Sequence, residues 1–94
     1  MPLFDELAAL DRLVRIAKHD TGQSGRCADF ILAWWNARKY GGFDLVHLWM
    51  LDESICADMA LVFGLIAKSN RYPDFWGYEK DIHAIIDEWR PSTD

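Results

Sequence analysis

The sequence predicts an all-α fold: a compact, irregular bundle of four main helices plus one short helix. Apolar residues recur at three- and four-residue spacing in four separate segments, as in helices that bury one face. No useful stretch alternates apolar and polar residues as a half-buried strand does, and no Asn-Gly hairpin signal occurs. The 94 residues are 51% apolar, so we expect a single helical domain spanning residues 1–94.

The first expected helix carries an apolar stripe with acids in its first turns and bases in its last. The helix dipole favours this order of charges. We expect the helix to end at His19–Gly22, with Gly22 as the left-handed exit. The stripe is formed by Leu3, Leu7, Leu10, Val14 and Ala17.

A second helix is expected after a short loop at residues 23–25, with Ser24 as its candidate N-cap. Its inward face carries apolar residues from Cys27 to Ala37, and Gly41–Gly42 supplies an abrupt stop. Trp34 and Trp35 lie about 100° apart on such a helix. One of the two indoles is therefore expected near the edge of the buried stripe or outside it.

Residues 43–49 are expected to form one or two helical turns, capped by Asp44, before Asp52 caps a longer helix. That longer helix has two adjoining apolar faces, which predicts that it lies at the centre of the bundle. Gly64 within it indicates close packing by another element, because a mid-helix glycine costs about 1 kcal/mol relative to alanine. The two faces are formed by Ile55, Met59, Val62 and Ile66, and by Cys56, Phe63 and Ala67.

Pro73 breaks the helical pattern, and residues 75–77 are expected to form a turn or a single 3₁₀ turn. A last amphipathic helix follows and ends before Pro91. Its apolar stripe consists of Tyr78, Ile82, Ile85, Ile86 and Trp89.

The two cysteines, Cys27 and Cys56, are expected to be reduced, buried thiols, since two cysteines form neither a disulfide framework nor a zinc site. His83 and Asp87 stand four residues apart and could offer two metal ligands, but two ligands make no site, so a surface charge pair is favoured. We therefore expect no metal and no cofactor. The segment at residues 21–26 resembles an anion-binding loop only weakly and is interpreted as a capped interhelical loop.

No catalytic residue is expected. His47 lies near Asp44 and Asp52 in the sequence and could act as an oriented general base. A structural histidine is the favoured interpretation. A small enzyme using His47 and a cysteine remains a remote alternative.

Net charge is −5, and residues 73–94 carry six acids against two bases. This balance argues against direct nucleic-acid binding, which needs a basic patch. The N-terminus has no apolar signal segment, and the longest run without a charge, Met59–Ala67, is far too short to span a membrane. A cytoplasmic protein without membrane contact is expected.

Five tryptophans in so short a chain favour an interaction surface, because tryptophan, tyrosine and arginine are the usual anchors of protein interfaces. A tryptophan-rich core is an equally good interpretation. The candidate partner-binding residues are Trp35, Arg38, Tyr40, Trp49, Arg71, Tyr72, Phe75 and Trp76, with the acids Glu79, Asp81, Asp87 and Glu88.

The stretches TGQSGRCADFILAWWNARKYGGFDLVHLW and AKSNRYPDFWGYEKDIHAIIDEWRP resemble a family of small uncharacterised proteins found on bacterial integrative and conjugative elements. The likeness covers roughly residues 20–91. It implies a context in which small acidic proteins bind and disable host machinery, including CRISPR effector complexes. We therefore expect a non-enzymatic, anti-CRISPR-like inhibitor whose acidic last helix occupies a basic groove of a protein or nucleoprotein partner. A structural or regulatory homodimer is the alternative.

Overall fold

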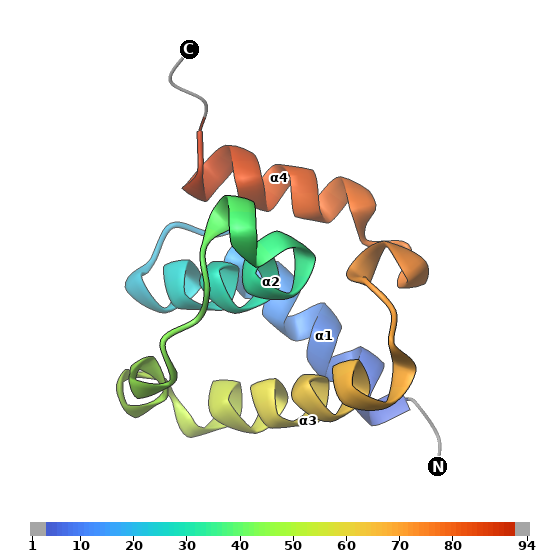
Figure 1. Cartoon of the computed structure of the whole chain (residues 1–94). Helices are drawn as coiled ribbons and strands as arrows, with labels where there is room; N and C mark the ends of the chain where they lie inside the picture. Colours follow the sequence, from blue (N-terminus) through green and yellow to red (C-terminus); the bar gives the residue numbers. More distant parts are fainter. Residues whose placement is uncertain (1–3, 92–94) are drawn as a thin grey trace.

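Helix α1 (Phe4–Ala17) lies at the centre of the fold, in a computed structural model that describes residues 4–91 (Figure 1). It packs against all three other long helices, α2 (Gly22–Tyr40), α3 (Glu53–Ser69) and α4 (Glu79–Trp89). Two 3₁₀ helices, η1 (Leu45–Met50) and η2 (Pro73–Trp76), connect them. Within residues 4–91 there is no strand, so the prediction of an all-α fold with four main helices is confirmed.

The core is built around the stripe of α1. Of the residues predicted for this stripe, Leu10, Val14 and Ala17 are buried and Leu7 is half-buried, while Leu3 lies outside the described part of the chain. Side chains from all four helices meet it, and each core residue is nearly inaccessible to solvent. The largest fully buried ones are Leu10, Leu13, Ile31, Leu32, Leu65, Ile82 and Ile85.

The prediction that the long helix after Asp52 is central was wrong. α3 packs one face on α1, through Ile55, Met59, Val62 and Leu65, and leaves its second apolar face uncovered. On that face the Phe63 side chain is 67% exposed. The close packing expected at Gly64 is also absent among residues 4–91, because a Cβ added there would meet none of their atoms within 4 Å.

Ion pairs join α1 to its neighbours. Arg12 donates two hydrogen bonds to Asp58 on α3, from Nε and from Nη2, each 2.9 Å long. Lys68 on α3 bonds to Glu6, which lowers the pKa of the Glu6 carboxyl below its usual value. Lys18 at the end of α1 pairs with Asp81 on α4. These contacts place α3 and α4 on α1 in a defined register.

The cap between α1 and α2 differs from the prediction. Thr21, not Ser24, is the N-cap of α2: its side chain accepts a hydrogen bond from the Ser24 backbone N–H. Gly22 begins α2 and is not the left-handed exit of α1, which already ends at Ala17. The stop at the other end of α2 is confirmed, because Gly41 has a positive φ of 97°.

The segments around η1 and η2 match the sequence prediction more closely. The Asp44 side chain caps η1 by accepting from the Val46 N–H at 3.0 Å. Asp52 is the N-cap residue of α3, although its carboxylate accepts from Gln23 on α2 instead of from α3. The 3₁₀ turn expected at residues 75–77 is present as η2, but it begins earlier, at Pro73.

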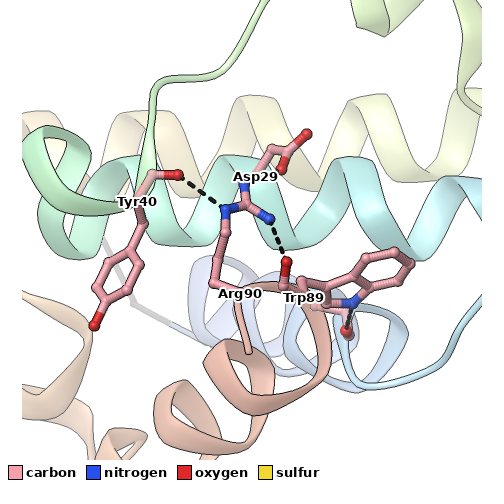
Figure 2. Close-up of polar contacts among 5 residues, drawn as sticks. Asp29, Tyr40, Trp89 and Arg90 are labelled. Carbon is pink, nitrogen blue, oxygen red and sulfur yellow. Dashed lines mark hydrogen bonds and ion pairs between the residues drawn. The ribbon is translucent and has the colours of Figure 1, made fainter. Parts of the chain in front are cut away.

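The C-terminal end of α4 is fastened to α2 and α1 by two adjacent side chains (Figure 2). Arg90 bonds to the Tyr40 carbonyl from Nε at 3.1 Å and to the Asp29 carboxylate from Nη2 at 2.6 Å. The Trp89 indole N–H donates to the Ala17 carbonyl at 2.8 Å. Trp89 is therefore a structural tryptophan.

Over residues 4–91, no helix combines the length and low polarity that a membrane span requires.

Candidate protein-binding groove

An apolar groove runs between α2 and α3, where neither helix covers the other. We call this feature the apolar groove. Its first hollow, of about 280 Å³, is enclosed by Phe43, Leu45 and Leu48 on one side and by α3 on the other. A second hollow of about 310 Å³ continues it along Ala33 and Trp34 of α2. The two hollows share Phe30, Phe43, Leu45 and Phe63, so they form one continuous depression.

The local sequence explains why this groove exists. The Gly41–Gly42 stop turns the chain back over α2, and Phe43 then packs edge-on against Phe30 with ring centroids 5.4 Å apart. The short η1 helix presents Leu45 and Leu48 to the same space. Because η1 is too short to cover α3, Leu45 stays 70% exposed and Phe63 67% exposed.

An aromatic cluster lies at the far end of the groove, beside η2. Trp34 lines both the second hollow and a third one, of about 280 Å³, which is bordered by Arg71 and Tyr72. The Arg71 guanidinium lies 4.6 Å from the centroid of the Phe75 ring, a cation–π contact. The groove therefore passes from a wholly apolar end to an end that carries a positive charge.

Five predicted partner-binding residues meet in this aromatic cluster. Arg71, Tyr72, Phe75 and Trp76 are brought together by η2, and Trp35 joins them through a 6.2 Å edge-on contact with Tyr72. Tyr72 and Phe75 are 60% and 58% exposed. Trp35 and Trp76 are half-buried and pack against the core.

The other predicted aromatic and basic anchors are scattered. Trp49 is the most exposed tryptophan, at 83%, and lies on η1. Tyr40 is half-buried near the end of α2, where its carbonyl is bound by Arg90. Arg38 is exposed on the last turn of α2. The structure does not gather these three with the aromatic cluster.

The predicted acidic residues lie on α4, on the opposite side of the molecule from α3 (Figure 1). Glu79, Asp87 and Glu88 are exposed. Asp81 is instead paired with Lys18 and contributes to the packing of α4 on α1. Glu79 lies at the start of α4, close to η2, whereas Asp87 and Glu88 lie in its last turns.

The candidate chemical groups do not converge. Among the described residues, no three His, Cys, Asp or Glu side chains are grouped as a metal ion would require. His83 lies 3.9 Å from Glu79 and is not paired with Asp87 as the sequence suggested. The His47 ring packs edge-on to Phe43, and its buried Nδ1 atom has no hydrogen-bond partner among the described residues.

The two thiols differ in environment. Cys27 is fully buried, as predicted, and burial raises its pKa to about 12. Cys56 was also predicted to be buried, but it is only half-buried because it lines the apolar groove. Its S–H donates a hydrogen bond to the Leu48 carbonyl at 3.2 Å.

Sequence reasoning missed the groove residues Phe30, Phe43, Leu45 and Phe63 as a binding surface. The sequence did indicate the α3 side of this surface, through the second apolar face of that helix and the uncharged run from Met59 to Ala67. We interpreted that signal as a sign of burial on two sides. Periodicity identifies an apolar face but not the element that covers it.

The comparisons with known proteins identify a family but no activity. The family described as "Family of unknown function (DUF7673)" matches residues 7–90, so the chain belongs to this family. No curated protein and no solved structure matches the chain.

Proposed function

Starting from a family that carries no assigned activity, we propose that this protein is a non-enzymatic binding module whose apolar groove receives an amphipathic helix of a partner protein. The observation that carries the proposal is the pair of continuous hollows between α2 and α3, walled almost entirely by apolar side chains. Contiguous apolar surface of this kind on a soluble protein marks an interaction site. The core residues themselves are nearly inaccessible to solvent, so the groove is an open surface beside a packed core.

The dimensions of the groove favour a helix as its occupant. Along α3 it extends from Cys56 to Asn70, which corresponds to about 21 Å, or four helical turns. A helix of that length places apolar anchors at i, i+3 or i+4, and i+7 on one side. Phe63 and Leu45 border the space that such anchors would fill.

The positive charge of Arg71 at the aromatic end of the groove indicates which charge the partner helix should carry there. Arg71 is exposed, and its guanidinium is stacked on Phe75. A carboxylate near one end of the partner helix would complement this charge and fix the orientation of binding. The occupant we propose is therefore an apolar, amphipathic helix with an acidic residue at one end.

A selection from a displayed peptide library tests this proposal. Wild-type protein alone is the target of the selection, and the Leu45→Glu variant is compared with it afterwards on the enriched peptides. Leu45 is 70% exposed, so the substitution should leave the fold intact and weaken selected helices by at least tenfold. Ala84→Glu, at an exposed position on α4, is the matched control and should bind like the wild type.

Selected peptides should also prefer an acidic terminal residue, and Arg71→Ala should remove that preference. If Leu45→Glu binds the enriched peptides as well as the wild type does, the groove is not the binding site and the proposal fails.

As to the identity of the partner, we propose a cytoplasmic component of a bacterial defence complex of the CRISPR type. The resemblance to proteins of mobile elements supports this proposal, and the exposed acids of α4 offer a second surface for a basic partner. Purified effector complex should lose target binding when the protein is added, and Glu79→Lys with Glu88→Lys should restore it. An effector complex that neither binds the protein nor loses activity would contradict this part of the proposal.

A further inference from the structure

The face of α3 that points away from α1 is unusually free of charge and of large side chains. Its exposed members between the two ends of the helix are Ala57, Ala60, Leu61, Gly64 and Ala67. The single charged residue between Glu53 and Lys68 is Asp58, which is buried and held by Arg12. This face adjoins the apolar groove, because Ala60 and Phe63 also line the first hollow of that groove.

No described residue of the chain explains Gly64. A glycine in the interior of a helix costs about 1 kcal/mol relative to alanine, and no other residue in the part of the chain that the structure describes comes close enough to require it. With Ala57, Ala60 and Ala67 it forms a smooth strip. Another helix could approach such a strip at the short end of the usual 8–10 Å interaxial distance.

We propose that a second copy of this chain packs its α3 antiparallel against this face across a two-fold axis. The charges at the two ends of the face fit that occupant. With the axis between Ala60 and Leu61, Glu53 of each copy lies opposite Lys68 of the other, and Ala57 lies opposite Gly64. The pairing is thus complementary in charge at both ends and has small residues facing each other between them.

Lys68 can serve this pairing while keeping its own bond to Glu6. Its ammonium has three donors, and the side chain is 44% exposed. The net charge of −5 disfavours contact between two copies in general. The uncharged face of α3 avoids that repulsion, because the acids of α4 lie on the opposite side of the molecule (Figure 1).

The size of the face predicts a weak dimer. A helix of 17 residues is about 25 Å long, so two of them bury less than the roughly 800 Å² per partner of a standard interface. We therefore expect reversible association with a dissociation constant of roughly 10–500 µM.

Sedimentation equilibrium between about 5 µM and 1 mM tests the proposal. The weight-average mass of the wild type should rise from 10.9 kDa toward twice that value. Gly64→Leu should remain monomeric at 1 mM and keep or raise its melting temperature, since leucine is the better helix former. Ala84→Leu on α4 is the matched control and should associate like the wild type.

A charge variant tests the register. Glu53→Lys should weaken association at least fivefold, whereas Glu79→Lys, the same charge change on α4, should not weaken it. A wild type that stays monomeric at 1 mM overturns the proposal, as does undiminished association of Gly64→Leu or equal behaviour of the two charge variants.

This proposal does not depend on the function of the groove, and the two can fail separately. Leu45→Glu should still dimerise while it loses peptide binding, and Gly64→Leu should still bind peptide while it loses dimerisation. If Leu45→Glu also abolishes the dimer, the second copy occupies the groove instead, and the α3 pairing is wrong.

Discussion

The replacement Phe63→Ala measures how much of the second apolar face of α3 belongs to the core. Full burial of a phenylalanine side chain contributes at most roughly 3 kcal/mol. Because the Phe63 side chain is 67% exposed, its share is at most about 1 kcal/mol. Alanine recovers roughly 0.5 kcal/mol through its higher helix propensity. We therefore expect the free energy of unfolding to change by less than about 1 kcal/mol.

Leu65→Ala, two residues further along α3, is the control. Leu65 is fully buried, and such a truncation costs about 2–5 kcal/mol. Urea unfolding of both variants should be followed by circular dichroism and tryptophan fluorescence at about 2 µM, where the proposed dimer is dissociated. A loss of 2 kcal/mol or more in Phe63→Ala would show that this side chain is a core residue and refute the reasoning.

Three further predictions concern packing, thiol reactivity and pH. Gly25→Ala should fail to gain the roughly 1 kcal/mol of helix propensity that alanine brings over glycine, as measured by urea unfolding, because its Cβ would lie 3.1 Å from the Trp89 ring and force that ring to shift. Iodoacetamide should modify Cys56 in the native protein and Cys27 only after unfolding, because Cys27 is buried with a pKa raised to about 12. The pKa of Glu6 is lowered in the folded state, so its stabilising contribution is present above pH 4.5 and is lost as pH falls through the lowered value. Glu6→Gln should therefore flatten the acid side of the stability–pH curve measured by thermal melting.

Each of these has a matched comparison. Gly22→Ala should be the more stable of the two glycine variants, because its Cβ would meet no atom closer than 3.7 Å; equal stability of the two would contradict the contact with Trp89. Native alkylation of both cysteines at one rate would contradict the burial of Cys27. Asp5→Asn, an exposed acid of the same helix turn, should leave the acid side of the curve steep. If the stability of Glu6→Gln still falls steeply at acid pH, the ion pair between Glu6 and Lys68 does not cause that fall.

The helices could be predicted from the sequence because their signals are local. The stripe from Leu7 to Ala17 identified α1 and the side that it buries. Gly41, Asp44 and Pro73 set boundaries through their own backbone and capping chemistry. The error at Gly22 was also local: Thr21 offered the better N-cap, and the glycine became the first residue of α2.

The centre of the fold and the groove could not be predicted in this way. Which of two apolar helices lies in the middle depends on contacts between distant residues, such as Arg12 with Asp58. The exposure of Leu45 and Phe63 depends on the length of η1, a short segment that reaches one side of α3 only. The number of tryptophans also could not predict which of them form a binding surface, because Trp89 holds α4 to α1 while Trp49 faces solvent.

Hydroxyl-radical footprinting of the dilute protein, with and without a library-selected helical peptide, tests the central claim most directly. We expect Leu45 and Phe63 to be oxidised readily in the free protein and protected by the peptide. Trp49 should be oxidised in both states, and Leu65 should be protected in both. If Phe63 is as protected as Leu65 in the free protein, or if the peptide leaves Leu45 and Phe63 unprotected, the groove is not an open helix-binding surface.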